Sequence, residues 1–351
     1  MSLPVSGNLS DHLDKSLTHC PRANSIVKNE VSDIFECEKL LKEWFNRDVI
    51  LLSSGRAGIH LFLQTIGFQR YKNKLEIPFY LSRCVINAIT PTAFPVNYPE
   101  NSDGILYYHQ HGFPQKWEPK SINIIEDIAH SFFYTEETGS RNWIGDVAVF
   151  SLPKFFSMNG LVGGLVLPNK EISSRIKELI NSHYKTNQQE TREWMRSMLN
   201  DSYKSNDEIK NIYLDSAYEL LLKLVLPDPI DLVGFPKTIE EIKRIGKARK
   251  KRIEFFFNFF KDDIYPESFW NKEDVFLPFA IPYFGKGDLN VLKQIDVALN
   301  ELNIKSGIYN IDINRNSRNS NYRPCVLIPS HHDIPMETFE KTCQIITNND
   351  K

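Results

Sequence analysis

The chain has 351 residues, of which 41% are hydrophobic, and its 42 basic and 44 acidic side chains leave a formal net charge of -2. This length and apolar content support a large core, with room for one big domain and a smaller one. The balanced charge argues against a dedicated nucleic-acid-binding protein, which would carry a basic excess or stripe. The one basic cluster, from Lys243 to Arg252, is predicted to be a solvated helix face.

The sequence shows no sign of a membrane or secretory destination. No apolar run approaches the roughly 20 residues of a membrane span, and the N-terminal stretch 1–16 is polar, without an apolar signal core. The cysteines are odd in number, scattered and without CxxC spacing: Cys20, Cys37, Cys84, Cys325 and Cys343. We therefore expect free thiols in a reducing, cytoplasmic compartment.

Short apolar strands alternate with helices in the first half of the chain. We expect strands at 49–52, 75–78, 105–108, 122–125, 147–151 and 165–167, and helices at 36–45, 57–66 and 84–90. This alternation predicts a mostly parallel sheet covered on both faces.

The second half is expected to be mainly helical over 171–260 and then to alternate. Strands at 279–282 and 325–328, with helices at 289–302 and 336–346, predict a small α/β unit. The expected organisation is an α/β fold with a large domain at 1–236 and a small C-terminal domain at 237–351.

The turn Ser54-Gly55-Arg56 stands between a predicted strand and a predicted helix. Ligands of open α/β sheets gather at the carboxyl ends of strands, and a helix start offers free N–H groups to an anion such as phosphate. The alternative is a plain helix N-cap by Ser53 or Ser54.

Two further strand ends carry reactive groups. The strand at 122–125 leads into Glu126 and Asp127, whose carboxylates could hold a protonated ring nitrogen or a metal, or merely cap a helix. Lys154 follows the strand at 147–151 among aromatic neighbours. Desolvation there would lower the pKa of its amine and make it nucleophilic, whereas an exposed charge would carry no chemistry.

Two other patterns are weaker. Ser151 and Lys154 spell S-x-x-K, the acylating pair of β-lactamases, but no S-D-N or K-T-G follows. No acidic residue completes a recognisable metal pattern with the histidines, so we expect no metal site. The histidines concerned are His109, His111, His331 and His332.

Together these segments resemble the DegT/DnrJ/EryC1/StrS family of sugar aminotransferases, which depend on pyridoxal 5'-phosphate (PLP). The matching stretches are 54–59 (S-G-R-A-G-I), 78–89 from the proline to N-A-I, 107–112 (Y-Y-H-Q-H-G), 126–130 (E-D-I-A-H), 145–151 (G-D-V-A-V-F-S), Lys154 with the glycine pair at 163–164, and 327–331 (L-I-P-S-H). The stretch 126–130, against the family's E-D-x-A-[HQ], is the most specific match. The resemblance covers 33–167 well and the C-terminal domain loosely.

The resemblance implies an aspartate-aminotransferase-like (type I) fold with bound PLP. Lys154 would form the Schiff base with PLP, Asp127 would pair with its pyridine nitrogen and His130 would lie beside it. The phosphate would be held by the turn residues Ser54, Gly55 and Arg56 together with Ser151. Arg56 replaces the family's common threonine, and we expect its backbone N–H to serve. The family's ring-stacking aromatic position is Ser82 here, with Tyr80 nearby.

The resemblance also implies the reaction. Family members transfer an amino group from an amino acid, here expected to be glutamate, to a keto-sugar, expected to be nucleotide-linked, and act as homodimers. The family's G-Y-N-x-R-M motif, which crosses the dimer, is absent. The alternatives are another PLP-dependent sugar modification, such as dehydration, or a non-catalytic binding or regulatory protein. Lys154, which is histidine in related dehydratases, and Asp127 argue against them.

Overall fold

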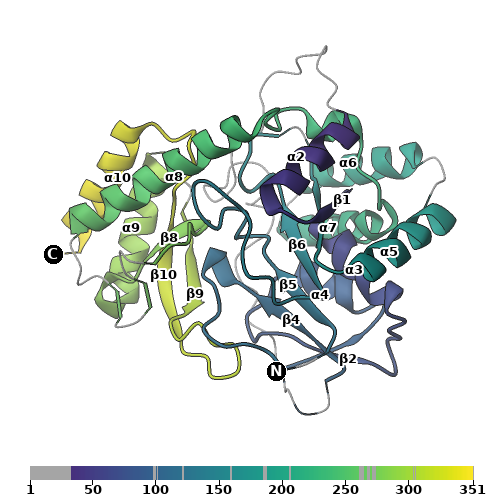
Figure 1. The fold of residues 1–351 in the computed structure, drawn as a ribbon. Coiled ribbons are helices and arrows are strands. Elements are labelled where there is room, and N and C mark those ends of the chain that lie inside the picture. Colours follow the sequence, from purple (N-terminus) through teal and green to yellow (C-terminus); the bar gives the residue numbers. More distant parts are fainter. Residues whose placement is uncertain are drawn as a thin grey trace.

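The computed structural model describes residues 33–350, apart from gaps at 98–99, 101, 121, 159, 185–187, 205–206, 261–264, 267–268, 271–273, 303 and 305 (Figure 1). The polar N-terminal stretch 1–16 and Cys20 lie outside these residues. The described cysteines are free thiols, as predicted: Cys37, Cys84, Cys325 and Cys343. Within the described ranges, no helix combines the length and apolarity needed to cross a membrane.

A seven-stranded sheet forms the centre of the molecule, with the order β1-β7-β6-β5-β4-β2-β3. Only β7 runs antiparallel to its neighbours, β1 and β6, so the predicted mostly parallel α/β sheet is confirmed. The carboxyl ends of β1, β4, β5 and β6 therefore lie along one edge. The strands are β1 (Asp48–Leu52), β2 (Lys74–Glu76), β3 (Phe94–Val96), β4 (Gly104–Tyr108), β5 (Ile124–Asp127), β6 (Val147–Ser151) and β7 (Gly163–Leu167).

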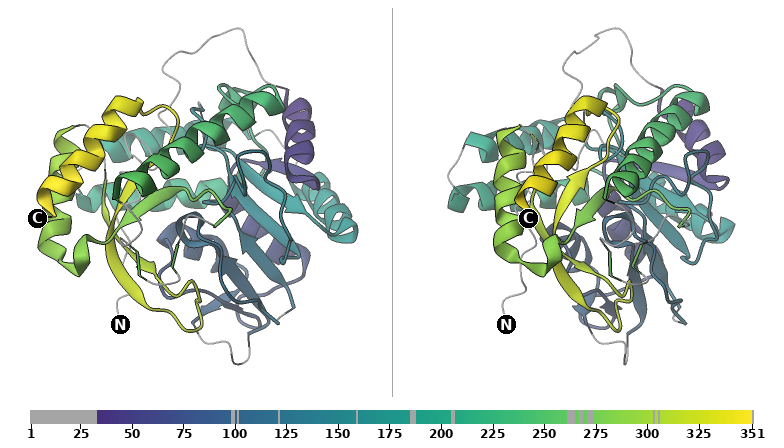
Figure 2. Two further views of the ribbon diagram at one scale, coloured as in Figure 1. Left: turned by 60° about the vertical axis from the view of Figure 1, so that its left-hand side comes forward. Right: turned by 90° about the vertical axis from the view of Figure 1, so that its left-hand side faces the viewer.

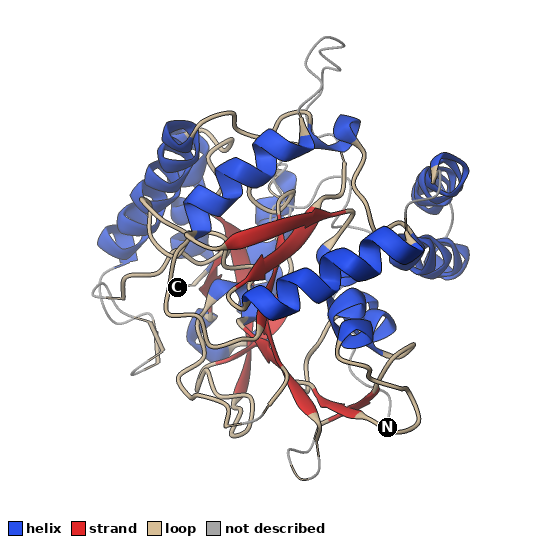
Figure 3. Cartoon of the chain, turned by 45° about the vertical axis from the view of Figure 1, so that its right-hand side comes forward, coloured by secondary structure: helices blue, strands red, loops and turns tan. Residues whose placement is uncertain are grey.

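Helices cover both faces of this sheet because its strands are apolar on both sides (Figure 3). Val49 and Leu51 of β1 pack into a core shared with α2 (Ile34–Phe45) and α8 (Ile239–Phe260). Ile50 and Leu52 alternate with these two residues along the strand, so they point to a second core on the opposite face of the sheet. The helices of that second core are α3 (Gly55–Thr65), α4 (Arg83–Ile89) and α5 (Lys170–His183).

A helical pair lies outside the second layer. Helices α6 (Gln189–Lys204) and α7 (Asp207–Lys223) pack against each other, and α7 also packs against α3 and α4. Tyr218, Leu214 and Ala217 of α7 are buried in a small cluster with Cys84 of α4. Arg83 of α4 forms an ion pair with Asp215 of α7. The pair thus covers the starts of the two helices that follow β1 and β2.

The C-terminal part builds a second, antiparallel sheet with the order β8-β10-β9 (Figure 2). Helices α9 and α10 pack against each other, with α9 also on β9 and β10 and α10 also on α8. The elements are β8 (Ala280–Tyr283), α9 (Leu289–Glu301), β9 (Ile308–Asp312), β10 (Tyr322–Pro329) and α10 (Met336–Asn349), with 3-10 helices η1 (Gln110–Gly112), η2 (Pro229–Leu232) and η4 (Gly285–Gly287).

A polar clamp joins the small sheet to the large one. Arg318, from the β9–β10 connection, donates two hydrogen bonds to the buried carboxylate of Glu76, at 2.9 and 2.7 Å. Its guanidinium carbon also lies 4.5 Å from the ring centroid of Trp117. Because the pair is bidentate and its carboxylate is buried, this contact is stronger than a salt bridge between two exposed side chains.

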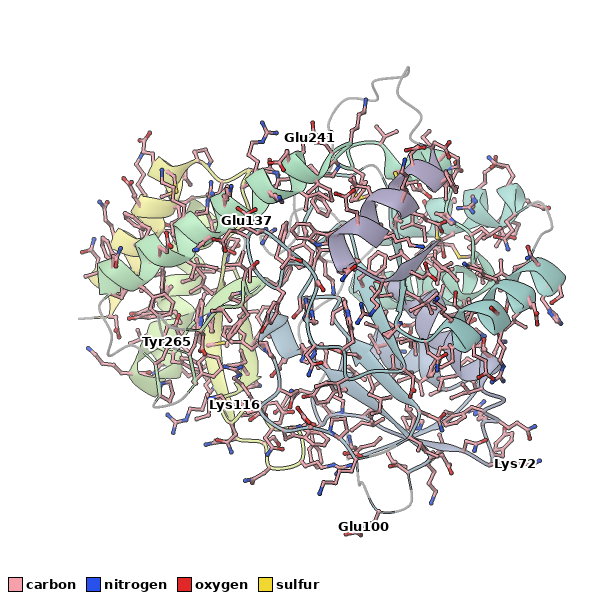
Figure 4. All side chains as sticks on the ribbon, in the orientation of Figure 1. Lys72, Glu100, Lys116, Glu137, Glu241 and Tyr265 are labelled. Atoms are coloured by element: carbon pink, nitrogen blue, oxygen red, sulfur yellow. The ribbon has the colours of Figure 1, made fainter. Side chains whose placement is uncertain are left out.

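Two further contacts belong to the clamp. Gln110 donates to Asn310 O at 2.8 Å and accepts from Asp312 N at 2.9 Å. The backbone N–H of Lys116, labelled in Figure 4, donates to Arg315 O at 2.7 Å. The segment that follows β4 is thus joined to β9 and its following loop through both side chains and backbone.

Some expectations about the elements were wrong. The strand predicted at 122–125 begins two residues later, because Asn123 adopts the left-handed conformation (φ 60°) and Ile122 is exposed. Strands β3 and β9 were not predicted; β3 is a three-residue edge strand containing a proline. The basic cluster in α8 is not a uniformly solvated face, because Arg249 and Arg252 are buried.

Candidate active site

Four chain segments bring the predicted site residues to one edge of the large sheet. Asp127 ends β5 and Ser151 ends β6, its parallel neighbour. Tyr108 ends β4 on the other side of β5 and pairs in register with Asp127. The turn at Ser54 follows β1, which lies beyond β7. Such an edge is where open α/β sheets bind ligands.

A tight turn after β6 fixes Lys154. The backbone N–H groups of Phe155 and Phe156 both donate to Leu152 O, at 2.9 and 3.1 Å, and both phenyl rings are buried in the core. Lys154 Nζ lies 2.9 Å from His130 Nε2. Burial lowers the pKa of the Lys154 amine to about 8, although the nearby Asp127 carboxylate opposes this shift. The structure therefore favours the partly desolvated amine over the exposed charge, the two alternatives that the sequence left open.

His130 connects Lys154 to Tyr108. The Tyr108 hydroxyl lies 3.2 Å from His130 Nδ1, so the phenol and the lysine amine contact the two opposite nitrogens of one imidazole ring. Phe279 stacks on that ring, with centroids 4.8 Å apart. Burial raises the pKa of Tyr108 far above its ordinary value, which keeps the phenol neutral. The ring of His130 is thereby held in one orientation beside the amine.

Asp127 is 3% exposed, and burial raises the pKa of its carboxyl group above the usual value. The charge of Lys154 opposes this shift, and so does a hydrogen bond of 2.9 Å from Ala129 N to Oδ1. A buried carboxylate favours a cation or strong donor beside it, because the charged form is otherwise poorly solvated. A protonated ring nitrogen is such a partner.

Glu126 faces the other side of the strand and has a structural role. Its Oε2 accepts from the N–H groups of Ile144 and Gly145 at 3.0 and 3.1 Å, and its Oε1 lies 3.1 Å from His109 Nε2. Because Gln115 N donates to His109 Nδ1, the hydrogen of that ring is on Nε2 and is donated to Glu126. His109 is thus hydrogen-bonded within the protein, and no group of metal-binding side chains occurs within the described ranges.

The start of α3 lies against the end of β6. Ser54 is the N-cap of α3, and its Oγ accepts from Ala57 N at 3.2 Å, as the N-cap alternative predicts. A Cβ atom added to Gly55 would lie 3.0 Å from Phe150 O, and one added to Gly163 would lie 2.4 Å from Gly55 N. Glycine at both positions allows backbone contact between α3, β6 and β7. The turn and Ser151 are therefore close in space, although about a hundred residues separate them.

Arg56 is half-buried, and its guanidinium lies toward α4 and α7. Its guanidinium carbon lies 4.1 Å from the ring centroid of Tyr218. Burial opposes its charge, but contacts with Cys84 and Tyr218 outweigh burial, so the pKa of Arg56 lies above its ordinary value. Its charge also contributes to the lowered pKa of Lys154.

Tyr80 and Ser82 occupy the loop before α4. The Tyr80 ring packs on Tyr322 of β10, with centroids 4.3 Å apart. Ser82 precedes the first residue of α4, and its Oγ lies 3.1 Å from Cys84 Sγ. Tyr80 therefore joins the loop before α4 to the small sheet.

Sequence reasoning missed four residues that surround this site. Tyr108 and Cys84 lie inside recognised motif stretches, so position within the motif was a usable signal. Phe279 and Tyr218 come from distant segments, and no local pattern connects them with Lys154. Their approach depends on tertiary packing.

A protein-family model described as "Putative PLP-dependent aminotransferase" matches residues 38–350. No protein with a curated description matches the chain. Among solved structures, the PLP form of a putative sugar aminotransferase, Spr1654 from Streptococcus pneumoniae, is similar with a TM-score of 0.63 at 13% identity, covering 91% of each chain.

Two other solved structures have a similar fold over most of both chains. A DegT DnrJ EryC1 StrS aminotransferase from Brucella abortus gives a TM-score of 0.61 at 14% identity, covering 90% of this chain and 89% of its own. The sugar aminotransferase CalS13 from Micromonospora echinospora gives 0.58 at 14% identity, covering 90% and 91%. At these identities the likeness concerns the fold, and the type I fold inferred from the motifs is confirmed. With the family match over residues 38–350, the chain belongs to the PLP-dependent aminotransferases, and PLP is its cofactor.

Proposed function

We propose that the enzyme transfers an amino group from an amino acid, glutamate in the first instance, to a keto-sugar that is nucleotide-linked. Membership of the family identifies amino transfer as the reaction. The sequence motifs and the names of the similar structures support a sugar as the acceptor. The observation that carries the proposal is the position of the half-buried Lys154, whose amine lies 2.9 Å from His130 Nε2 and close enough to Asp127 for the carboxylate charge to affect it.

The residues at the sheet edge fit PLP. The cofactor needs an amine to attach to, a carboxylate for its ring nitrogen and an anion cradle for its phosphate. Lys154, Asp127 and the glycine-lined contact between Gly55 and Gly163 have these chemical properties. When bound, PLP supplies an electron sink for chemistry at the amino-bearing carbon.

Side chains of the protein would carry out the remaining steps. We assign covalent attachment and the movement of the substrate proton to the Lys154 amine, a general acid and base once it is released. Asp127 would keep the ring nitrogen protonated through a charge-assisted hydrogen bond. His130 would orient the amine. Ser54, Gly55 and Ser151 would contact the phosphate, while Tyr80 and Ser82 would border the ring.

The proposal has a direct spectroscopic test. The purified protein should show the absorbance of PLP bound to a lysine, and glutamate should remove that band with release of 2-oxoglutarate. A nucleotide-linked keto-sugar should then restore the band. If glutamate leaves the band unchanged while another amino acid removes it, the assignment of the donor is wrong. If no donor removes it, the proposed reaction is wrong.

The pH dependence of cofactor attachment is a second prediction. Only the free amine attacks an aldehyde, and a Lys154 pKa of about 8 places half of it in that form near pH 8. Attachment should therefore rise as pH increases toward 8 and level off above it. An exposed lysine, with a pKa of ~10.4, would continue to gain reactivity to higher pH. Trapping with cyanoborohydride at each pH, with peptide mapping, gives the profile of Lys154 and of exposed lysines such as Lys247.

We further propose a homodimer in the cytoplasm, acting on small-molecule substrates, with large and small domains that divide near residue 236. The dimer follows from the family resemblance. Sedimentation velocity would test it, and a monomer that binds PLP tightly would contradict it.

A further inference from the structure

Arg249 of α8 is an arginine buried in an aromatic core, with 1% of its surface exposed. Its guanidinium carbon lies 4.9 Å from the ring centroid of Phe155 and 6.0 Å from that of Phe133. Helix α8 packs against both α2 and α10, so it links the helices on the two sheets (Figure 1). A buried guanidinium is costly, and apolar residues of similar volume often pack at least as well. Core packing alone therefore does not account for an arginine here.

The hydrogen bonds of Arg249 go to two backbone carbonyl groups. Its Nη2 donates to Lys154 O and its Nη1 to Phe279 O, each at 3.4 Å. The first acceptor belongs to the residue that is proposed to bind the cofactor. Phe155, whose ring faces the guanidinium, is the next residue of the same turn. The guanidinium therefore holds the Lys154 turn through a carbonyl and through a neighbouring ring.

Phe279 connects the second carbonyl to the same lysine. It directly precedes β8, and its ring stacks on His130 with centroids 4.8 Å apart. His130 Nε2 in turn lies 2.9 Å from Lys154 Nζ. The backbone of Phe279 is fixed further, because its N–H donates to His111 O at 3.0 Å and its carbonyl also accepts from Ser330 Oγ at 3.4 Å. One guanidinium thus holds the backbone of the lysine and, through Phe279, the imidazole beside its amine.

We propose that Arg249 is a positioning residue for Lys154, which fixes the backbone of the lysine and the ring of Phe279 so that the amine stays beside His130. The inference rests on the proposed PLP site at Lys154 and extends that site to α8. Reacting groups need such support, because a displacement of about 1 Å can cost roughly 10²-fold in rate. The planar fork of an arginine suits this role, since its donors are fixed relative to one another.

The first test is the pH profile of cofactor attachment at Lys154, measured in the full chain by cyanoborohydride trapping and peptide mapping. Arg249→Met keeps the approximate volume and removes every donor, so the lysine should become more exposed to water. Burial is the main cause of the lowered pKa of its amine, which is about 8. The midpoint of attachment should therefore move to higher pH by about 0.5–1 unit, toward the ~10.4 of an exposed lysine.

Arg249→Lys separates positioning from charge. It keeps a positive charge, but one ammonium cannot donate to both carbonyls in the same geometry. Its midpoint should also move upward, by at least half of the shift in Arg249→Met. A wild-type midpoint in Arg249→Lys would show that only the charge acts on the amine, and would overturn the positioning role. The other side chains that act on the amine are unchanged in both variants: Asp127, Cys84 and Arg56.

Arg252→Met is the matched control. Arg252 is 5% exposed, lies three residues further along α8 and also donates to backbone carbonyl groups, those of His332 at 3.1 Å and of Ile334. Loss of a buried arginine should lower the melting temperature in both methionine variants. Only Arg249→Met should shift the profile of Lys154.

Turnover gives a second readout. With the active amino donor, Arg249→Met should lower kcat by about 10- to 100-fold and leave KM within about twofold, because the groups that bind the donor are unchanged. Phe279→Leu keeps the carbonyl and removes the ring over His130, so it should reproduce part of this loss. In the double variant with Arg249→Lys the two effects should be less than additive, since both residues act on one imidazole.

Each remaining outcome has a definite meaning. Equal pH profiles in wild type and Arg249→Met would overturn the inference, and so would an equal shift in Arg252→Met, which would indicate a general loosening of the core. If Arg249→Met does not fold, Arg249→Lys and Phe279→Leu decide, and wild-type values in both would overturn the inference. A wild-type protein that attaches no PLP at Lys154 would instead refute the proposed function.

Discussion

Lys154→Ala should abolish covalent attachment of PLP and reduce amino transfer by at least about 10²- to 10⁴-fold, the usual contribution of a positioned acid–base group. The variant should still bind PLP noncovalently, since the Ser54-Gly55 turn and Asp127 remain. Lys154 is the group to replace because the wild-type protein places its amine 2.9 Å from His130 Nε2 and beside Asp127.

Intact-mass measurement after cyanoborohydride reduction gives the direct readout. The wild type should gain one cofactor mass, located on the peptide that contains Lys154, and Lys154→Ala should gain none. Lys247→Ala is the matched control, since Lys247 is an exposed lysine paired with Glu137. A label on another lysine of the wild-type protein would refute the assignment, whatever the effect on turnover.

Asp127→Asn should lower turnover by roughly 10²- to 10³-fold, as expected when a group that stabilises developing charge is removed. An amide cannot hold a ring nitrogen in its protonated form as a carboxylate does, because the charge-assisted hydrogen bond is lost. Cofactor binding should weaken less than turnover, since the phosphate contacts and Lys154 are unchanged. Wild-type turnover by this variant would exclude Asp127 as the ring partner.

Glu126→Gln is the control for this variant, because Glu126 is the adjacent residue on the opposite face of the strand. Its carboxylate accepts from two backbone N–H groups and from His109. Contacts with His109 and Arg141 and a backbone hydrogen bond outweigh the effect of burial, so the pKa of Glu126 lies below its usual value. The substitution should therefore reduce the free energy of unfolding by about 1.5–3 kcal/mol. Turnover of the folded protein should be nearly unchanged.

Local patterns were sufficient to predict most of the large sheet and the identity of the reactive groups. The strand–turn–helix unit around Ser54 and the turn that carries Lys154 between β6 and β7 each contain their own signal, since apolar runs end at a glycine turn or at a lysine. The residue types at these ends then indicate the chemistry. The approach of Ser54 to Ser151 also follows from topology, because carboxyl ends of parallel strands share an edge.

The remaining features depend on long-range packing. β5 begins later than predicted because Asn123 has a left-handed backbone conformation, and nothing in the apolar run 122–125 indicates that conformation. Arg249 is buried because its guanidinium packs against Phe155 and donates to Phe279 O, from segments far away in the chain. The contact of Tyr218 with Arg56 is of the same kind, since α7 carries only a general helical pattern. The domain division near residue 236 stays a prediction.

The polar clamp between the two sheets has a consequence for the local unfolding of the molecule. Arg318 cannot leave Glu76 without exposing a buried carboxylate, and Gln110 uses both ends of its amide on β9. Opening the small sheet therefore removes partners from the large one, which couples their local unfolding free energies. Hydrogen exchange in β9 and β4 should consequently report a single cooperative unit. A ligand bound tightly at the edge of the large sheet should therefore also protect backbone amides of the small sheet.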